Sequence, residues 1–220
     1  MVTRDFVIVG GGIIGINIAR ELKRIFSNAK VTLLEKEHEC GLHASSRNSG
    51  VLHAGFYYSP DSLKAKFTRL GNKLLTGYCE SKKLPINKCG KLVVAKHHRE
   101  HLMLEELLKR GRVNSIEVQE VTEKEAKEIE PRVKTCERAI FSPTTATVDP
   151  TAVVSAMKSD AINEKVEIRC GARYIKKRKS AIYTESGIFE AGYVVNAAGL
   201  YADKIAKDFG YSENYRILPF

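Results

Sequence analysis

Apolar runs and an apolar helical stripe alternate over the first 35 residues of the chain. Residues 5–10, DFVIVG, and residues 30–35, KVTLLE, predict two buried strands. The segment between them, residues 13–26, predicts a helix with one apolar face, formed by Ile14, Ile18, Leu22 and Ile25. A strand, a helix and a strand within about 30 residues make a β-α-β unit, so we expect the opening of a doubly wound parallel sheet.

Further elements follow with less regular spacing. We expect helices at about residues 61–82, 98–110, 122–131, 150–163 and 200–208. We expect strands at about residues 91–95, 115–118, 138–142, 166–169, 172–177, 180–185 and 187–195. The chain stops in a strand-like apolar run, YRILPF, and domains rarely finish inside a strand. We therefore expect a truncated chain.

Side chains suited to helix starts precede three of these helices. Ser59 or Asp61 is suited to cap the helix expected at 61–82, whose apolar stripe is Leu63, Phe67, Leu70, Leu74 and Tyr78. Thr122 and Glu125 have the spacing of a capping box. Asp149 followed by Pro150 combines a cap with a proline at the first helical position.

Glycines at positions 10, 12 and 15 form the pattern G-x-G-x-x-G. The pattern follows a predicted strand and opens a predicted helix, and Glu35 ends the next strand 20 residues after Gly15. In this context the glycines permit a tight turn, a close approach of the backbone to a pyrophosphate, and close packing of helix on sheet. The helix N-terminus attracts phosphates, and Glu35 can accept hydrogen bonds from a ribose. The pattern predicts a dinucleotide site, for NAD or FAD.

The order of the later elements favours FAD. An NAD dehydrogenase would continue with β-α-β repeats, whereas here a polar loop, a helix and a mixed segment precede the return to the sheet near residue 150. The segment 193–203, YVVNAAGLYAD, is an apolar strand ending in small residues, which allows a second close approach of backbone to a dinucleotide. FAD, extended across one Rossmann domain, suits this arrangement.

Five segments carry a resemblance to a known family: DFVIVGGGIIG, VTLLEKE, RNSGVLHAGFYYSPDSLKAKF, CGKLVVA and VVNAAGLYAD. They resemble the FAD-dependent family that contains D-amino-acid oxidase, glycine and sarcosine oxidases and glycerol-3-phosphate dehydrogenase, and within it the oxidases and dehydrogenases of L-2-hydroxyglutarate. The resemblance implies an α/β fold: a Rossmann-type FAD-binding domain with an inserted, incomplete α+β substrate domain. It implies an FAD-binding domain at residues 1–84 and 147–212, and a substrate domain at 85–146 and 213–220.

The resemblance also implies where the cofactor lies. The loop after Glu35 would wrap the flavin, with residues 45–48 along the pyrophosphate and ribityl chain and Ser49 and Gly50 near the isoalloxazine. The implied cofactor-binding residues are Gly10, Gly12, Ile13, Ile14, Gly15, Glu35, Lys36, Ser45, Ser46, Arg47, Asn48, Ser49, Gly50, Tyr174, Ala198 and Gly199. Arg47 stands where L-2-hydroxyglutarate enzymes often have a second histidine, and it is similar to the Ser-Ser-Arg loop of glycerol-3-phosphate dehydrogenases.

The implied reaction is the oxidation of an L-2-hydroxy acid, above all L-2-hydroxyglutarate, to the 2-keto acid, with oxygen or a quinone as electron acceptor. A base must take the hydroxyl proton, and His53 is our candidate. The alternative for His53 is a purely structural hydrogen-bonding role. Tyr57 and Tyr58 are candidates to hold the substrate carboxylate, or else they pack between domains. Other family reactions stay open: oxidation of glycerol-3-phosphate or of an amine, or an inactive half of a split flavoprotein.

The net charge of +10, from 36 basic and 26 acidic residues, favours anionic partners. The basic run at residues 176–179 lies between two predicted strands and is typical of a solvated hairpin turn, with attraction to a membrane surface as the alternative. We expect no nucleic-acid partner, because no recognition motif is present. Five cysteines without a C-x-x-C pair indicate reduced thiols.

Residues 97–101, HHREH, match the H-x-x-E-H order of some zinc peptidases. Their position at the start of a predicted helix favours a solvated helix end, so we expect no metal.

No apolar run approaches the length of a membrane span, and the first apolar segment starts at about Asp5, which leaves no room for a leader. We expect a cytoplasmic protein, with peripheral contact to the inner face of the membrane as the alternative. The expected partners are the small hydroxy acid, the electron acceptor, and either the missing C-terminal half or a second copy of the chain.

Overall fold

The computed structural model describes residues 2–219 and divides the chain into two compact units. The first unit contains the residues up to Asn48 and those from Pro150 onward, and the second contains Ser49–Asp149. The second unit is therefore inserted into the first. The assignment of residues 49–84 to the FAD-binding domain, like the other domain boundaries, stays a prediction.

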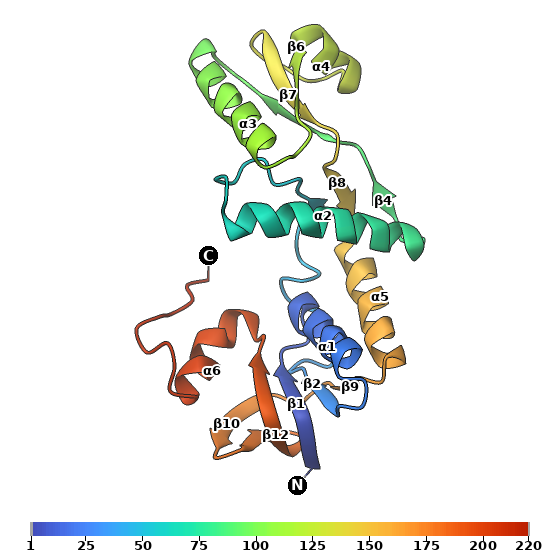
Figure 1. Ribbon diagram of the computed structural model, residues 1–220, viewed down its shortest axis with the longest axis vertical. Coiled ribbons are helices and arrows are strands. Elements are labelled where there is room, and N and C mark those ends of the chain that lie inside the picture. Colours follow the sequence, from blue (N-terminus) through green and yellow to red (C-terminus); the bar gives the residue numbers. More distant parts are fainter. Residues whose placement is uncertain (1, 220) are drawn as a thin grey trace. The chain divides into compact units, whose positions relative to one another are not determined.

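A six-stranded sheet forms the centre of the first unit (Figure 1). Its strands are β1 (Val2–Val9), β2 (Val31–Leu34), β9 (Glu167–Arg169), β10 (Tyr174–Arg178), β11 (Ala181–Thr184) and β12 (Gly187–Asn196), in the order β10-β11-β12-β1-β2-β9. The four strands from β12 to β9 are parallel, and β10 and β11 extend the sheet as an antiparallel hairpin. The predicted Rossmann-type α/β fold is confirmed.

Helix α1 (Ile13–Ile25) connects β1 to β2 and packs beside α5 (Pro150–Asn163). Its buried residues are Gly15, Ile16 and Ala19. The predicted apolar face is therefore wrong: Ile14 and Ile25 are exposed, and Ile18 and Leu22 are half-buried. Gly15 and Ala19 are small, which lets this side of the helix approach the sheet more closely than a row of isoleucines would.

The first unit ends with a 3₁₀ helix (Gly199–Tyr201), helix α6 (Ala202–Asp208) and a segment without regular structure. The strand-like run expected at the end is not a strand as far as residue 219, and Phe220 lies outside the described residues. The N–H of Ile217 instead donates to the Asp203 carboxylate, at 3.1 Å. A strand forms when its backbone groups pair with a neighbouring strand. Here the backbone N–H of Ile217 pairs with a side chain instead.

The basic run 176–179 also differs from its predicted position. Its first three residues lie in β10, paired with β11, and the turn follows at Lys179, whose φ is 54°. Alternate side chains of a strand can remain solvated, so the run does not need to form the turn itself.

The second unit contains two three-stranded sheets. One consists of β3 (Val51–Leu52), β8 (Ala146–Val148) and β4 (Ile86–Asn87), and the other of β5 (Lys91–Val94), β7 (Arg138–Ser142) and β6 (Gln119–Thr122). The strand expected at 115–118 was misplaced, because β6 begins at Gln119. The unit's helices are α2 (Leu63–Ser81), α3 (His101–Val113) and α4 (Glu123–Ile129), and α4 has the predicted capping box of Thr122 and Glu125.

The main core of the second unit joins α3 to the sheet of β5, β7 and β6. Its buried residues are Ala54, Phe56, Ala95, Leu104, Leu107, Leu108, Ile116 and Ile140. The start of α3 also lies close to the end of β5 and the start of β7, because the N–H of Cys136 donates to the carbonyl O of Ala95 and His101 contacts the carbonyl O of Cys136.

Helix α2 differs from its prediction in two respects. Ser62, rather than Ser59 or Asp61, caps it, and the Ser62 side chain accepts a hydrogen bond from the N–H of Ala65. The predicted apolar stripe is solvent-exposed over most of its length: Leu63, Phe67, Leu70 and Leu74 are 67%, 59%, 48% and 63% exposed. The residues that α2 buries are Ala65 and Cys79, on another side of the helix.

Across residues 2–219, no helix is both long enough and apolar enough to cross a membrane.

Candidate functional site

A cavity of about 770 Å³ opens in the first unit at the carboxyl ends of three parallel strands. Val9 is the last residue of β1 and Gly10 follows it. Leu34 is the last residue of β2 and Glu35 follows it, and Ala197 comes directly after β12. Ligands of open α/β sheets bind at this edge of the sheet. The remaining walls come from the start of α1, the loop after β2, residues 172–175 and α6.

The turn between β1 and α1 needs glycine at two positions. Gly10 has a φ of 118°, and a Cβ there would lie 2.2 Å from the carbonyl O of Ala197. A Cβ on Gly15 would lie 1.9 Å from the carbonyl O of Gly10. Neither position can take a side chain without moving backbone. The turn therefore packs closely against the backbone that follows β12. The backbone of Gly12 and the first turn of α1 line the mouth of the cavity.

Glu35 is buried, and both of its carboxylate oxygens accept backbone hydrogen bonds. Oε2 accepts from the N–H of Gly11 at 2.7 Å, and Oε1 accepts from the N–H of Glu37 at 2.9 Å. The acid thereby ties the end of β2 to the glycine turn while still lining the cavity. Each carboxylate oxygen has a second lone pair, so the chemistry expected of a ribose-binding acid is retained.

The loop after β2 returns to the start of α1 at Ser45. The Ser45 hydroxyl accepts a hydrogen bond from the N–H of Ile13 at 2.9 Å. The cap residue of α1, Gly12, has no side chain to do this. Ser45 thus serves as the cap of α1 from a distant position, and it brings the loop to the cavity.

The wall formed by residues 172–175 and α6 was only partly expected from the sequence. The Tyr174 hydroxyl donates to the Asp208 carboxylate, which also accepts from the N–H of Lys177 at 2.8 Å. Burial and this carboxylate raise the pKa of Tyr174, so the phenol stays protonated. The Nζ atoms of Lys36 and Lys204 lie 5.2 and 5.3 Å from the centre of the Tyr201 ring. Lys204, Tyr201 and Asp208 belong to the short helical segment predicted after the Ala-Ala-Gly run, but the sequence did not indicate them as site residues.

The loop after β2 also carries a cluster of charges. Glu37 accepts hydrogen bonds from Lys36 and from His43 Nε2, and these contacts lower the pKa of Glu37 to about 2. Lys36 and His43 line the cavity, and the ionised Glu37 carboxylate offsets part of the positive charge that Lys36 brings to this wall.

The structure brings most of the predicted cofactor residues together. Those that line the cavity are Gly10, Gly12, Ile13, Ile14, Glu35, Lys36, Ser45, Asn48, Tyr174, Ala198 and Gly199. Gly15 lies behind them, between α1 and the sheet. Ser46 and Arg47 are not among the lining residues, and Arg47 is exposed. Ser49 and Gly50 belong to the second unit.

The candidate catalytic residues lie in the second unit. His53 follows β3 and is exposed, and its pKa is lowered by partial desolvation and by the charge of Lys91. The Lys91 Nζ also lies 4.7 Å from the centre of the Tyr57 ring. Tyr57 stacks on buried Phe56, with ring centres 4.3 Å apart. Lys91, which the sequence did not indicate as a site residue, is therefore adjacent to both His53 and Tyr57.

The residues that line the cavity are suited to bind a dinucleotide. A backbone turn without side chains faces a helix N-terminus, an acid lies at the end of the second strand, and a second run of small residues follows β12. These features supply space and N–H groups for a pyrophosphate and a carboxylate for a ribose.

Comparison with known proteins agrees with this geometry. The model of the DAO family, FAD dependent oxidoreductase, matches residues 5–220. A mitochondrial L-2-hydroxyglutarate dehydrogenase of Nematostella vectensis is 36% identical over 98% of this chain and 51% of its own length. An L-2-hydroxyglutarate dehydrogenase of Indibacter alkaliphilus is 37% identical over 97% of this chain and 55% of its own. The chain thus spans about half the length of the curated relatives it matches.

A solved structure extends the comparison to the fold. The dithionite-reduced L-alpha-glycerophosphate oxidase of Mycoplasma pneumoniae, with FAD bound, has a TM-score of 0.84 and 32% sequence identity. The match covers 94% of this chain and 57% of that one.

Proposed function

Because the chain belongs to the family of FAD-dependent oxidoreductases, we propose that its first unit binds FAD in the cavity at the carboxyl edge of the sheet. The observation that carries this is the meeting of the glycine turn, Glu35 and the run after β12 around one cavity. The N-terminus of α1 would face the pyrophosphate and Glu35 the ribose. When bound, FAD supplies the acceptor for the two electrons of an oxidation.

We propose that the protein to which this chain belongs oxidises an L-2-hydroxy acid, with L-2-hydroxyglutarate as the favoured substrate. The relatives named for that substrate support the choice. His53 would accept the proton of the substrate hydroxyl. A lowered pKa keeps its imidazole neutral near pH 7, and a base must be in that form.

Lys91 is the cation that we propose for a substrate carboxylate. It is half-buried at the start of β5, its charge acts on His53, and its Nζ stands near the Tyr57 ring. A carboxylate bound to Lys91 would lie near the base that takes the neighbouring hydroxyl proton. Tyr57 supports this arrangement from the core, because its ring is fixed by Phe56.

A second candidate substrate is glycerol-3-phosphate. The similarity to the glycerophosphate oxidase and the Ser-Ser-Arg sequence at residues 45–47 favour it. A phosphate also suits a lysine. A substrate screen with a full-length version separates the two, since only one of the two compounds should bleach the flavin.

The exposed stripe of α2 supports a polypeptide partner. Four large apolar side chains in a row on a helix are typical of a surface that packs against protein. We propose that a second copy covers this stripe when the chain is studied by itself.

Oxygen or a quinone remains the proposed electron acceptor, and the positive charge is compatible with peripheral membrane contact. Absence of liposome binding at low salt would contradict that contact.

The first experiment is FAD titration of the purified chain, followed by visible absorption and then addition of L-2-hydroxyglutarate. We expect saturable flavin binding. Gly12→Ala places a Cβ 3.1 Å from Ser45 Oγ at the mouth of the cavity, and should weaken FAD binding by about tenfold or more, since overpacking costs about 1–3 kcal/mol. Gly71→Ala is the matched control, because a Cβ there meets nothing within 4 Å. Equal affinities of the two variants would contradict the proposed site.

A further inference from the structure

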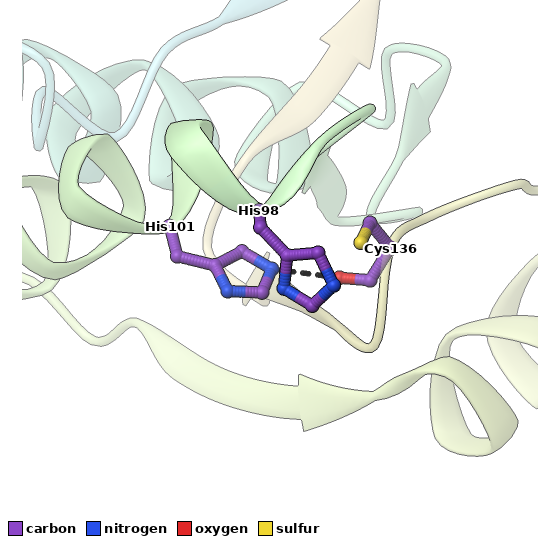
Figure 2. Close-up of side chains that lie close together, drawn as sticks. All are labelled: His98, His101 and Cys136. Atoms are coloured by element: carbon purple, nitrogen blue, oxygen red, sulfur yellow. Dashed lines mark hydrogen bonds between the residues drawn. The ribbon is translucent and has the colours of Figure 1, made fainter.

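The structure assembles a cluster of metal-ligand side chains in the second unit, and none of them lines the cavity. His98, His101 and Cys136 each offer a ligand atom, and these three atoms all lie within 4.8 Å of one another (Figure 2). The three residues come from two segments, the start of α3 and the loop before β7.

The two histidines are brought together by a short 3₁₀ helix (His98–Glu100) that runs directly into α3. In a 3₁₀ turn, side chains three residues apart lie on the same side of the helix. The two imidazole rings accordingly have centres 5.2 Å apart and meet edge to face. The turn is closed by the Glu100 carboxylate, which accepts from the N–H of Lys96 at 2.6 Å. The Glu100 carboxylate is therefore engaged in closing this turn.

Cys136 is fixed by hydrogen bonds between strand ends. Its N–H donates to the carbonyl O of Ala95 at 2.7 Å, and its own carbonyl O accepts from the N–H of Arg138 at 2.7 Å. The same carbonyl O is 2.9 Å from Nε2 of His101, the contact drawn as a dashed line in Figure 2. The backbone that presents the thiol is therefore already in place, and His101 is already oriented against it.

The solvent-facing part of the cluster contains the exposed side chain of His98 and the nearby carboxylate of Glu137. The side chain of His98 is 73% exposed, and its Nδ1 lies 3.6 Å from Oε2 of Glu137. Zinc binds nitrogen at about 2.0–2.1 Å and sulfur at about 2.3 Å, so its ligand atoms lie closer together than 4.8 Å. An exposed imidazole can make this adjustment by side-chain rotation, without disturbing the core.

We propose that His98, His101 and Cys136 bind a Zn²⁺ ion, with Glu137 as a fourth or neighbouring acidic group. Imidazole and thiolate select zinc-like transition metals over Mg²⁺ and Ca²⁺, which prefer oxygen ligands. The Cys136 thiol releases its proton to solvent as the bond to zinc forms. The ion joins the start of α3 to the loop before β7 and so stabilises the second unit.

A second cluster, formed by Glu39, Cys40 and Cys170, is less suited to bind a metal ion. Lys158 already occupies the Glu39 carboxylate. Burial raises the pKa of the Cys40 thiol to about 12 and also raises that of Cys170. A metal would have to displace these thiol protons at a higher cost than it would for an ordinary cysteine.

The test uses the whole chain after treatment with a chelator, titrated with Zn²⁺ and separately with Co²⁺. We expect one ion per chain and a thiolate-to-cobalt charge-transfer band in the near ultraviolet. Cys136→Ser should abolish that band, and His98→Ala should weaken binding by about tenfold or more. The controls are Cys89→Ser and His97→Ala, an exposed cysteine elsewhere and the adjacent exposed histidine.

Three results would overturn the site: no charge-transfer band, an unchanged band in Cys136→Ser, or equal losses in His97→Ala and His98→Ala. Thermal unfolding gives an independent readout, because Zn²⁺ should raise the Tm of the wild-type chain and leave that of Cys136→Ser unchanged. Neither measurement depends on FAD, so failure here is distinguishable from failure of the proposed oxidoreductase.

Discussion

The hydroxyl of Ser45 accepts a hydrogen bond from the backbone N–H of Ile13, across 32 residues of sequence. Ser45→Ala should lower the free energy of unfolding by about 0.5–2 kcal/mol, the usual effect of removing a helix cap. It should also weaken FAD binding, because the hydroxyl lines the cavity. Flavin titration and denaturant unfolding measure the two effects. Ser46→Ala is the control, since Ser46 lies outside the cavity lining, and an equal loss of FAD affinity in both variants would contradict this role.

Replacing Lys91 should change the titration of His53. Partial desolvation and the Lys91 charge both lower the pKa of His53, so Lys91→Met should raise that pKa toward the ordinary histidine value. The change can be followed by NMR titration of the imidazole. In an active version of the enzyme, the acid limb of the kcat/KM profile should move to higher pH, and KM should rise. Lys64→Met is the matched control, because the Lys64 Nζ lies near the ring of Tyr58. A His53 pKa unmoved in Lys91→Met would contradict the proposed electrostatic coupling.

The stripe of α2 should govern self-association. Leu70→Lys combined with Leu74→Lys places two charges on the exposed apolar face, and should shift the chain toward monomer in light scattering coupled to size exclusion. Lys73→Gln, on the same helix, should leave association unchanged. A wild-type chain that is monomeric at high concentration would refute the proposal that a second copy covers this face.

Glu167 should make stability depend on acid pH. Burial would raise the pKa of this carboxyl, but hydrogen bonds from Thr32, Arg169 and Arg4 outweigh it and lower the pKa. A lowered folded-state pKa gives stability that is present above the ordinary carboxyl value and is lost as the pH falls below it.

Glu167→Gln should therefore cost about 1–3 kcal/mol of unfolding free energy at pH 7 and progressively less as the pH falls toward 3. Denaturant unfolding at several pH values measures this difference. Glu185→Gln is a suitable comparison, because the Glu185 carboxylate pairs with Arg173 on the surface. A Glu167→Gln effect that is independent of pH would show that packing, rather than charge, is lost.

The opening β-α-β unit was predictable because its signals are local: Gly10, Gly12, Gly15 and Glu35 fall within one short segment. The buried face of α1 was not, because counting large apolar residues favoured Ile14, whereas the sheet requires the small Gly15. Lys91 and Cys136 could not be predicted as neighbours of His53 and His101. The pairing of β5 with β7 brings Cys136 to the start of α3, whereas Lys91 and His53 belong to strands or strand ends of two different sheets, and a single sequence does not state which strands pair.

The pairing of β1 with β12, with Val7 opposite Val194, joins two strands that are separated in sequence by the whole inserted unit. Of the two strands, β1 is synthesised first, and β12, which completes one of its edges, is synthesised only after the entire inserted unit. At about 5–20 residues per second, that interval is roughly ten seconds or longer. During it, β1 carries an apolar edge open to wrong partners. A chaperone that recognises unpaired strands should therefore bind β1 during synthesis, and its release should coincide with the emergence of β12.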